Sequence, residues 1–230
     1  MGCHIFNAVG IKAQETLLGY YEYKGVKRVA VACKDFALNG YALQDFASIK
    51  NQIIDSGSNG YGIELSDIIE AIEKQAFMDP IELMEHFWNM FVVDALIGNW
   101  DRYNGNWGFL YNQENDEIRL APIFDCGSSL FPQADENMLS NFLKNKSEFE
   151  ARVYDYPTSS LVLSGKRINY CNFINSHMYK ACDDAIKRIK PKINLAAVNT
   201  MIDNVDILTE VHKTFLKKII EARYQALFDE

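Results

Sequence analysis

Three side chains near the middle of the chain, Asp101, Asn106 and Asp125, carry oxygen ligands in a defined order. The first two lie in GNWDRYNGNWGFL (residues 98–110), and the third lies in APIFDCGSSLF (residues 121–131). Phosphoryl transfer needs a carboxylate that orients or deprotonates an attacking hydroxyl, and two further oxygen ligands that hold magnesium against nucleotide phosphates. Protein kinases use this Asp-x-x-x-x-Asn spacing, followed by Asp-x-Gly. We therefore expect Asp101 to be the catalytic base and Asn106 and Asp125 to bind magnesium.

Each of these residues also has a purely structural interpretation. Asp101 could end a helix or shape a turn, Asn104 and Asn106 could form turns, and Asp125 could cap the turn that follows it. The order and the spacing of the set favour the catalytic interpretation. For Arg102 the sequence predicts a salt bridge or a contact with phosphate, and does not identify the partner.

The elements around these residues must bring them together. The apolar segment 80–97 begins with a proline and predicts a buried helix that leads into the first polar loop. Alternating residues in 107–111 and 118–122 predict two strands joined by a polar turn. A short hairpin thus separates Asp101 from Asp125, so the two acidic loops are expected to lie close together.

The rest of the chain predicts a small β-containing part followed by a mainly helical part. Residues 133–155 show no strong periodicity. The other predicted elements are a short helix that ends at Gly10, a hairpin around Lys24 and Gly25 that ends near Cys33, a helix over 43–55, a flexible glycine-rich loop over 56–62, and helices over 66–77, 172–190, 193–203 and 204–228.

Composition narrows the class of protein. The chain has 230 residues, 48% of them hydrophobic, and a formal net charge of −8. These values predict one folded unit without direct nucleic-acid binding or membrane association. Five scattered cysteines suggest neither a disulfide framework nor a zinc site. The N-terminus has no basic start and no signal cleavage site, which predicts a cytoplasmic protein and leaves secretion without a signal peptide open.

The segment DALIGNWDRYNGNWGFLYNQENDEIRLAPIFDCGSSLF resembles the catalytic core of the HipA-like serine/threonine kinases, most closely their CtkA-like members. The resemblance implies an α+β, protein-kinase-like fold that uses ATP and magnesium. It divides the chain into a truncated N-lobe and hinge over 1–36 and a helical C-lobe over 37–230. In this family Asp101 falls on the base and Asn106 and Asp125 fall on the metal ligands. Tyr103 stands where many members have histidine.

The resemblance also implies a nucleotide site. VAVACKDF is similar to the interlobe hinge of the family, so the main chain of Cys33, Lys34, Asp35 and Phe36 is expected to bind adenine. The glycine-rich loop and the phosphate-binding lysine of such kinases have no counterpart in these 230 residues. This absence leaves three functions open.

The first possible function is ATP-dependent phosphorylation of Ser or Thr in a protein substrate. The second is a catalytically silent kinase-derived binding protein, or part of a split kinase, that binds an antitoxin-like or complementing subunit. The third is a small-molecule kinase. If the upstream strands are missing, the hairpin that ends near Cys33 is expected to expose apolar side chains and an unpaired edge.

Overall fold

The central element of the fold is the buried helix α4 (Pro80–Ile97) of the computed structural model, which describes residues 1–54 and 57–229. Asp79 caps the helix by accepting a hydrogen bond of 2.9 Å from the main-chain nitrogen of Ile81. Gly98 ends it in the left-handed conformation, with φ of 64°. A residue without Cβ adopts this conformation at little cost. The helix has the bounds that the sequence predicted, and it delivers the chain to the first polar loop.

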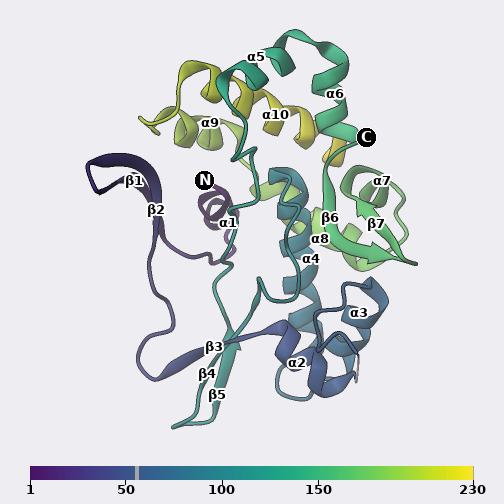
Figure 1. Cartoon of the computed structure of the whole chain (residues 1–230). Coiled ribbons are helices and arrows are strands. Elements are labelled where there is room, and N and C mark those ends of the chain that lie inside the picture. Colours follow the sequence, from purple (N-terminus) through teal and green to yellow (C-terminus); the bar gives the residue numbers. More distant parts are fainter. Residues whose placement is uncertain (55–56, 230) are drawn as a thin grey trace.

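Other helices surround α4 and one another (Figure 1). Those that pack on α4 are α1 (Gly2–Ala8), α3 (Leu65–Lys74), α8 (Lys180–Ile189) and α10 (Glu210–Phe228). Those that pack on α10 are α5 (Glu136–Lys144), α6 (Lys146–Tyr154), α7 (Tyr170–Asn175) and α9 (Leu195–Asp203), while α2 (Phe46–Ile53) packs on α3. The hydrophobic core is continuous through this body. None of the helices in the described part of the chain has the length and hydrophobicity needed to cross a membrane.

The described residues also form three small antiparallel sheets. The sheet next to the polar loops has the strand order β3 (Tyr41–Asp45), β4 (Gly108–Asn112) and β5 (Glu117–Leu120). Its middle strand is mostly buried, and Phe109 pairs with Leu120. The predicted hairpin between the two acidic loops is therefore present. The other sheets are β1 (Thr16–Tyr23) with β2 (Val26–Cys33), and β6 (Thr158–Leu163) with β7 (Lys166–Asn169).

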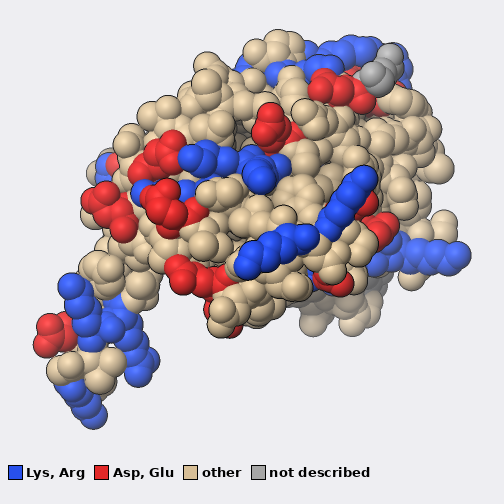
Figure 2. Space-filling model, turned by 90° about the horizontal axis from the view of Figure 1, so that it is seen from above, with Lys and Arg blue, Asp and Glu red and all other residues tan. Residues whose placement is uncertain are grey.

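The β1–β2 hairpin projects from the helical body (Figure 1). Its turn lies at Lys24 and Gly25, as predicted. Most of its side chains are exposed, including Leu17 at 73% and Val31 at 57%. Figure 2 shows basic side chains gathered on this projection, which carries Lys24, Lys27 and Arg28. The predicted exposure of apolar side chains on this hairpin is thus confirmed.

Several predicted boundaries are wrong. The helix expected over 43–55 begins only at Phe46, because residues 41–45 pair with β4 as strand β3. Asp55 at its predicted end lies outside the described residues. The helix expected over 172–190 is broken into α7 and α8 by residues 176–179, and the one over 204–228 begins at Glu210.

Two regions contain elements that the sequence patterns did not predict. Residues 133–155, without clear periodicity, form α5 and α6, which the side chains of Asp135 and Asn145 cap. The β6–β7 hairpin was also missed. Short elements of this kind depend on tertiary packing more than on a local pattern.

Candidate active site

The guanidinium of Arg102 joins the two acidic loops. Its Nη1 donates a hydrogen bond of 2.7 Å to the main-chain oxygen of Asn106 and a second hydrogen bond to the main-chain oxygen of Phe124. Its Nη2 lies 3.3 Å from Sγ of Cys126. Arginine is suited to this task because its donors are held in one plane. The two acidic loops are therefore close together, as expected, because Arg102 Nη1 donates to both of them. It binds Asn106 in the first loop and Phe124, the residue before Asp125, in the second.

Asp94, on the last turns of α4, is the countercharge of Arg102. Arg102 Nε lies 2.8 Å from Asp94 Oδ2, and Arg102 Nη2 lies 3.2 Å from Asp94 Oδ1. Both side chains are buried, at 4% and 1% exposed. Burial works to lower the pKa of Arg102, but the Asp94 carboxylate outweighs it and the pKa is raised. The sequence predicted a salt bridge or a phosphate contact for Arg102 without identifying its partner. In the structure Arg102 forms a buried ion pair with Asp94.

Hydrogen bonds to the main chain of Asp101 fix its position, and its side-chain carboxylate takes no part in them. Its nitrogen donates to Asn99 Oδ1 at 3.3 Å, and its oxygen accepts hydrogen bonds from Tyr103 N at 3.0 Å and from Asn106 Nδ2 at 2.8 Å. Among the described residues the Asp101 carboxylate makes no hydrogen bond or ion pair. A partly exposed and unpaired carboxylate is free to accept a proton from a substrate hydroxyl.

Asn106 is buried at 5% exposure and oriented by the bond to Asp101. Because Nδ2 is the donor in that bond, the amide oxygen Oδ1 is the atom left for a cation. Asp125 is exposed and lies in the left-handed region at φ of 48°, an uncommon conformation for a residue other than glycine. Within the described part of the chain its carboxylate has no hydrogen-bonding partner. The backbone strain at Asp125 is of the kind found at functional sites.

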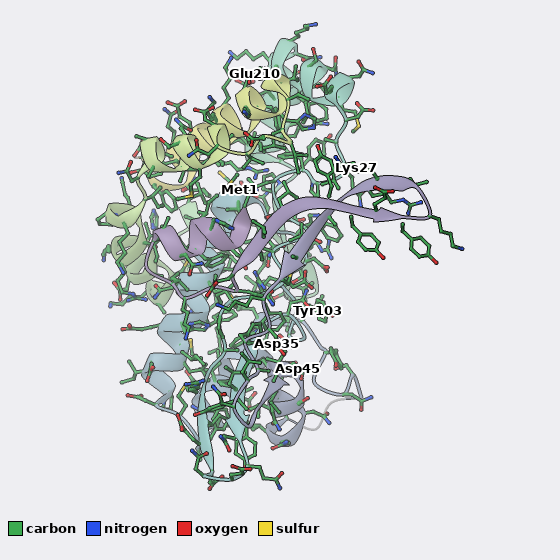
Figure 3. The ribbon with its side chains drawn as sticks, turned by 90° about the vertical axis from the view of Figure 1, so that its left-hand side faces the viewer. Met1, Lys27, Asp35, Asp45, Tyr103 and Glu210 are labelled. Carbon is green, nitrogen blue, oxygen red and sulfur yellow. The ribbon has the colours of Figure 1, made fainter. Side chains whose placement is uncertain are left out.

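The residues expected to bind adenine are the last residue of β2, Cys33, and the three residues that follow it, among which Figure 3 labels Asp35. The main chain of Lys34 is already occupied, because its nitrogen donates to Glu15 O at 2.9 Å and its oxygen accepts from Gln14 Nε2 at 3.1 Å. The main chains of Asp35 and Phe36 make no hydrogen bond with other described residues. Of the candidate hinge residues, these two therefore have main-chain groups to offer.

Phe36 connects this segment to the loop that is expected to bind metal. Its ring lies 5.7 Å from the ring of Phe124, centroid to centroid. The preceding residue of that loop, Ile123, is bonded to the chain before β1, since its nitrogen donates to Lys12 O at 2.9 Å and its oxygen accepts from Gln14 N at 2.8 Å. The structure thus brings the predicted adenine segment into contact with the residue before Asp125. Cys33, by contrast, is exposed at the strand end.

Asn104 anchors the loop before α3 and is not only a turn residue. It is fully buried, and its Nδ2 donates to the main-chain oxygens of Gly60 and Gly62, both at 2.8 Å. The ring of Tyr103, in place of the histidine common in the family, lies 6.3 Å from the ring of Tyr61. The candidate catalytic loop is therefore hydrogen-bonded to residues 60 and 62 of the loop that the sequence predicts to be flexible. Figure 3 shows Tyr103 beside the body, below the hairpin.

Sequence reasoning missed Asp94 and Asn99. Asn99 is fully buried, donates from Nδ2 to Asp94 Oδ1 at 2.9 Å, and accepts on its main-chain oxygen from the Tyr170 hydroxyl at 2.7 Å. One signal was available, since Asp94 is a lone carboxylate in an otherwise apolar helical run. A buried carboxylate requires a partner. Nothing in the local sequence identified that partner as Arg102, eight residues later.

The residues present fit magnesium coordinated partly by a nucleotide. Within the described residues, no three His, Cys, Asp or Glu side chains are grouped to hold a metal ion. Asn106 and Asp125 offer one amide oxygen and one carboxylate, which are hard oxygen ligands. Magnesium commonly completes its coordination with phosphate oxygens and water, so two protein ligands are sufficient.

The chain resembles known proteins over most of its length. A model of the HipA-like C-terminal domain matches residues 4–206. The serine/threonine-protein kinase CtkA of Helicobacter pylori is 44% identical over 230 residues, which are 100% of this chain and 70% of CtkA. The crystal structure of the H. pylori proinflammatory kinase CtkA superposes with a TM-score of 0.94 at 44% identity, covering 99% of this chain and 82% of that chain.

A more distant structure has the same fold. HipA in the Shewanella oneidensis complex with HipB and operator DNA aligns with a TM-score of 0.58 at 11% identity, over 97% of this chain and 54% of that chain. At this identity the similarity concerns the fold alone. Together with the matches above, it confirms a mixed α+β fold shared with the CtkA and HipA kinases. The family model and the full-length similarity to CtkA show that the chain belongs to the HipA-like kinase family.

Proposed function

We propose that the protein transfers the γ-phosphoryl group of ATP to a serine or threonine hydroxyl of a protein substrate. The observation that carries this proposal is the double hydrogen bond from Arg102 Nη1 to the main-chain oxygens of Asn106 and Phe124. These two hydrogen bonds join the loop that carries Asp101 and Asn106 to the loop that carries Asp125. The 44% identity to a serine/threonine-protein kinase favours a protein acceptor over a small molecule.

The three residues divide the chemistry. The Asp101 carboxylate accepts the proton of the attacking hydroxyl, and the bonds to its main chain keep it in position. Asn106 Oδ1 and the Asp125 carboxylate bind magnesium, which when present neutralises charge on the phosphates. Phosphoryl transfer depends mainly on positioning and electrostatic stabilisation. A loop held by a buried arginine provides such positioning.

The nucleotide base is proposed to lie against Asp35 and Phe36. Their main-chain groups have no partner among the described residues, and the Phe36 ring contacts Phe124 next to the proposed metal ligand Asp125. An ATP molecule with its adenine bound here would therefore have its base close to the loop that carries Asp125. Replacing Phe36 by alanine should weaken ATP binding with or without magnesium, whereas Asp125→Asn should weaken only the magnesium-dependent part.

Calorimetric titration with ATP tests the metal assignment. Wild-type protein is expected to bind ATP more tightly with magnesium than with EDTA, and Asp125→Asn should remove most of that difference. Asp116→Asn, in the exposed turn between β4 and β5, is the matched control and should leave it unchanged. Equal affinity with magnesium and with EDTA in the wild type would refute the roles of Asn106 and Asp125.

The projecting hairpin supports a second proposal, in which a further polypeptide segment covers β1 and β2 and completes the nucleotide site. Leu17, Val29 and Val31 are exposed at 73%, 55% and 57%, and the two strands pair only with each other among the described residues. Exposed apolar strands with open edges recruit additional strands. This segment would contribute the glycine-rich loop and lysine, for which the 230 residues hold no counterpart.

Co-expression tests this second proposal. The partner is the part of H. pylori CtkA that lies outside the matched region, since the match takes up 70% of that protein. We expect a stable complex, protection of β1 and β2 from hydrogen exchange, and increased ATP turnover. The proposal fails if the co-expressed segment does not bind. An antitoxin-like partner, by analogy with the HipA and HipB complex, stays a prediction.

A further inference from the structure

A surface hollow of about 250 Å³ lies beside the proposed catalytic loop. Gly98 and Trp100, just before Asp101, form one side of it, and Ser128 and Phe131, just after Asp125, form another. The third side comes from the β6–β7 hairpin and α10. The hollow is therefore bordered by both polar loops, and neither the proposed base nor the proposed metal ligands line it.

The hollow is lined by a buried cation that has no acidic partner among the described residues and whose guanidinium carbon lies 5.2 Å from the centroid of the Phe131 ring. Arg223 of α10 is only 4% exposed. Its Nε and Nη2 donate to the main-chain oxygen of Arg152 at 3.3 and 3.1 Å, while its Nη1 has no hydrogen-bonding partner among the described residues. Burial lowers the pKa of Arg223 to about 10, so the group stays protonated at neutral pH. An unpaired buried charge is costly, and an anion nearby would offset that cost.

A second arginine reaches the same hollow from the surface. Arg167 of β7 is exposed and lines it, together with the hydroxyl-bearing residues Ser128, Tyr156 and Thr158. No carboxylate is among the described residues that line this hollow. The protein as a whole carries a formal charge of −8, so a hollow lined by two arginines and no carboxylate is a local exception. Arginine and hydroxyl groups are typical donors to carboxylate and phosphate oxygens.

The position of the hollow relates it to the acceptor site. Trp100 is 48% exposed and directly precedes Asp101, so its Cα lies about 3.8 Å from that of the proposed base. An extended peptide advances about 3.3 Å per residue. A peptide whose hydroxyl is at Asp101 could therefore place a side chain one to three residues away in the hollow.

We propose that this hollow is a substrate subsite that binds an anionic side chain, aspartate, glutamate or phosphoserine, near the acceptor hydroxyl. The inference rests on the proposed kinase function and extends it to substrate specificity. Arg167 makes the direct contact, since Arg223 Nη1 is shielded from solvent. Arg223 adds a buried positive charge next to the hollow, where a low local dielectric strengthens its attraction for an anion.

Binding of three matched peptides tests the subsite. The peptides share one sequence without tryptophan and present alanine, glutamate or phosphoserine two residues from a central serine. Binding is followed by the intrinsic tryptophan fluorescence of the protein, in which Trp100 is the exposed tryptophan that lines the hollow. We expect the phosphoserine peptide to bind about tenfold more tightly than the alanine peptide, with the glutamate peptide between them. Arg167→Gln should reduce the preference to less than about twofold.

The controls separate a direct contact at Arg167 from a general effect of positive surface charge. Lys166→Gln removes one positive charge from the adjacent exposed position, which does not line the hollow, and should keep the preference. Arg223→Met removes the buried charge and should weaken the preference for the phosphoserine peptide. If this variant does not fold, the result for Arg167→Gln alone decides whether the subsite exists. ATP affinity, measured on the same proteins, should not change in any of these variants.

Two results would overturn the proposal. One is equal binding of the three peptides by the wild type. This result would overturn the proposal even if inorganic phosphate alone binds to the protein. The other is a preference that persists in Arg167→Gln or is lost equally in Lys166→Gln. Equal binding of the three peptides by a wild-type protein that still binds ATP in a magnesium-dependent way would refute the subsite alone. Peptide preference without any ATP binding, even when the complementing CtkA segment is co-expressed, would refute the kinase function and retain the subsite.

Discussion

Arg102 and Asp94 form a two-point ion pair beneath the proposed catalytic loop, with 2.8 Å between Nε and Oδ2 and 3.2 Å between Nη2 and Oδ1. The pair links the last turns of α4 to both acidic loops, because the same guanidinium binds the main chains of Asn106 and Phe124. The geometry of the proposed site thus depends on a carboxylate that touches no substrate.

Asp94→Asn should be strongly destabilising, because it leaves the guanidinium buried without its countercharge. The expected loss is about 3–5 kcal/mol in the free energy of unfolding, measured by urea denaturation. Glu70→Gln, which removes an exposed partner of Lys74, is the control and should cost less than about 1 kcal/mol. Similar small losses in both variants would show that the ion pair does not stabilise the fold.

Gly98→Ala should destabilise the end of α4 for two reasons. The residue has φ of 64°, and an added Cβ would lie 2.2 Å from Arg223 Nη1. Gly165→Ala is a matched control, because Gly165 has φ of 74° and an added Cβ there would meet no described atom within 4 Å. The control should lose about 1 kcal/mol for the conformation alone. A loss in Gly98→Ala no larger than in the control would contradict the close approach of Arg223.

His86 should make stability depend on pH. Burial, and next the charge of Arg102, lower its pKa from 6.5 to about 4, and its Nε2 has no solvent contact and no described partner. Below pH 6.5 the unfolded chain takes up a proton that the folded protein resists. The stabilisation present above pH 6.5 is therefore lost toward pH 4, at about 1.4 kcal/mol per pH unit.

Replacing His86 by phenylalanine isolates this effect from the titration of carboxylates. Urea unfolding of both proteins between about pH 7.5 and about pH 4.5 should give a steeper decline for the wild type. Parallel declines would show that His86 has an ordinary pKa in the folded protein.

The positions of the candidate catalytic residues could be read from the sequence because strong local patterns surround them. The helix over 80–97 and the hairpin that follows it have strong local patterns, so the order of Asp101, Asn106 and Asp125 could be read directly. Whether these residues have the proposed roles stays a prediction, as does the division into lobes at residue 36.

The residues that support the site were less predictable because their partners are distant or ambiguous in the sequence. Arg102 bonds to Phe124, 22 residues later, and Asn104 bonds to Gly60, 44 residues earlier. No local periodicity reports such contacts. Strand β3 was mistaken for the start of a helix for the same reason, since it exists through its pairing with β4.

The proposed function depends most directly on Asp101 as the base of a phosphoryl transfer. Transfer of labelled γ-phosphate from ATP to a protein substrate should be compared in wild type, Asp101→Asn and the control Asp116→Asn, with the complementing CtkA segment co-expressed if it binds. We expect Asp101→Asn to lower the rate at least about 100-fold, with ATP affinity within about twofold of wild type. The role of Asp101 is contradicted if Asp101→Asn keeps most of the wild-type rate, or if the wild type transfers no phosphate under any of these conditions.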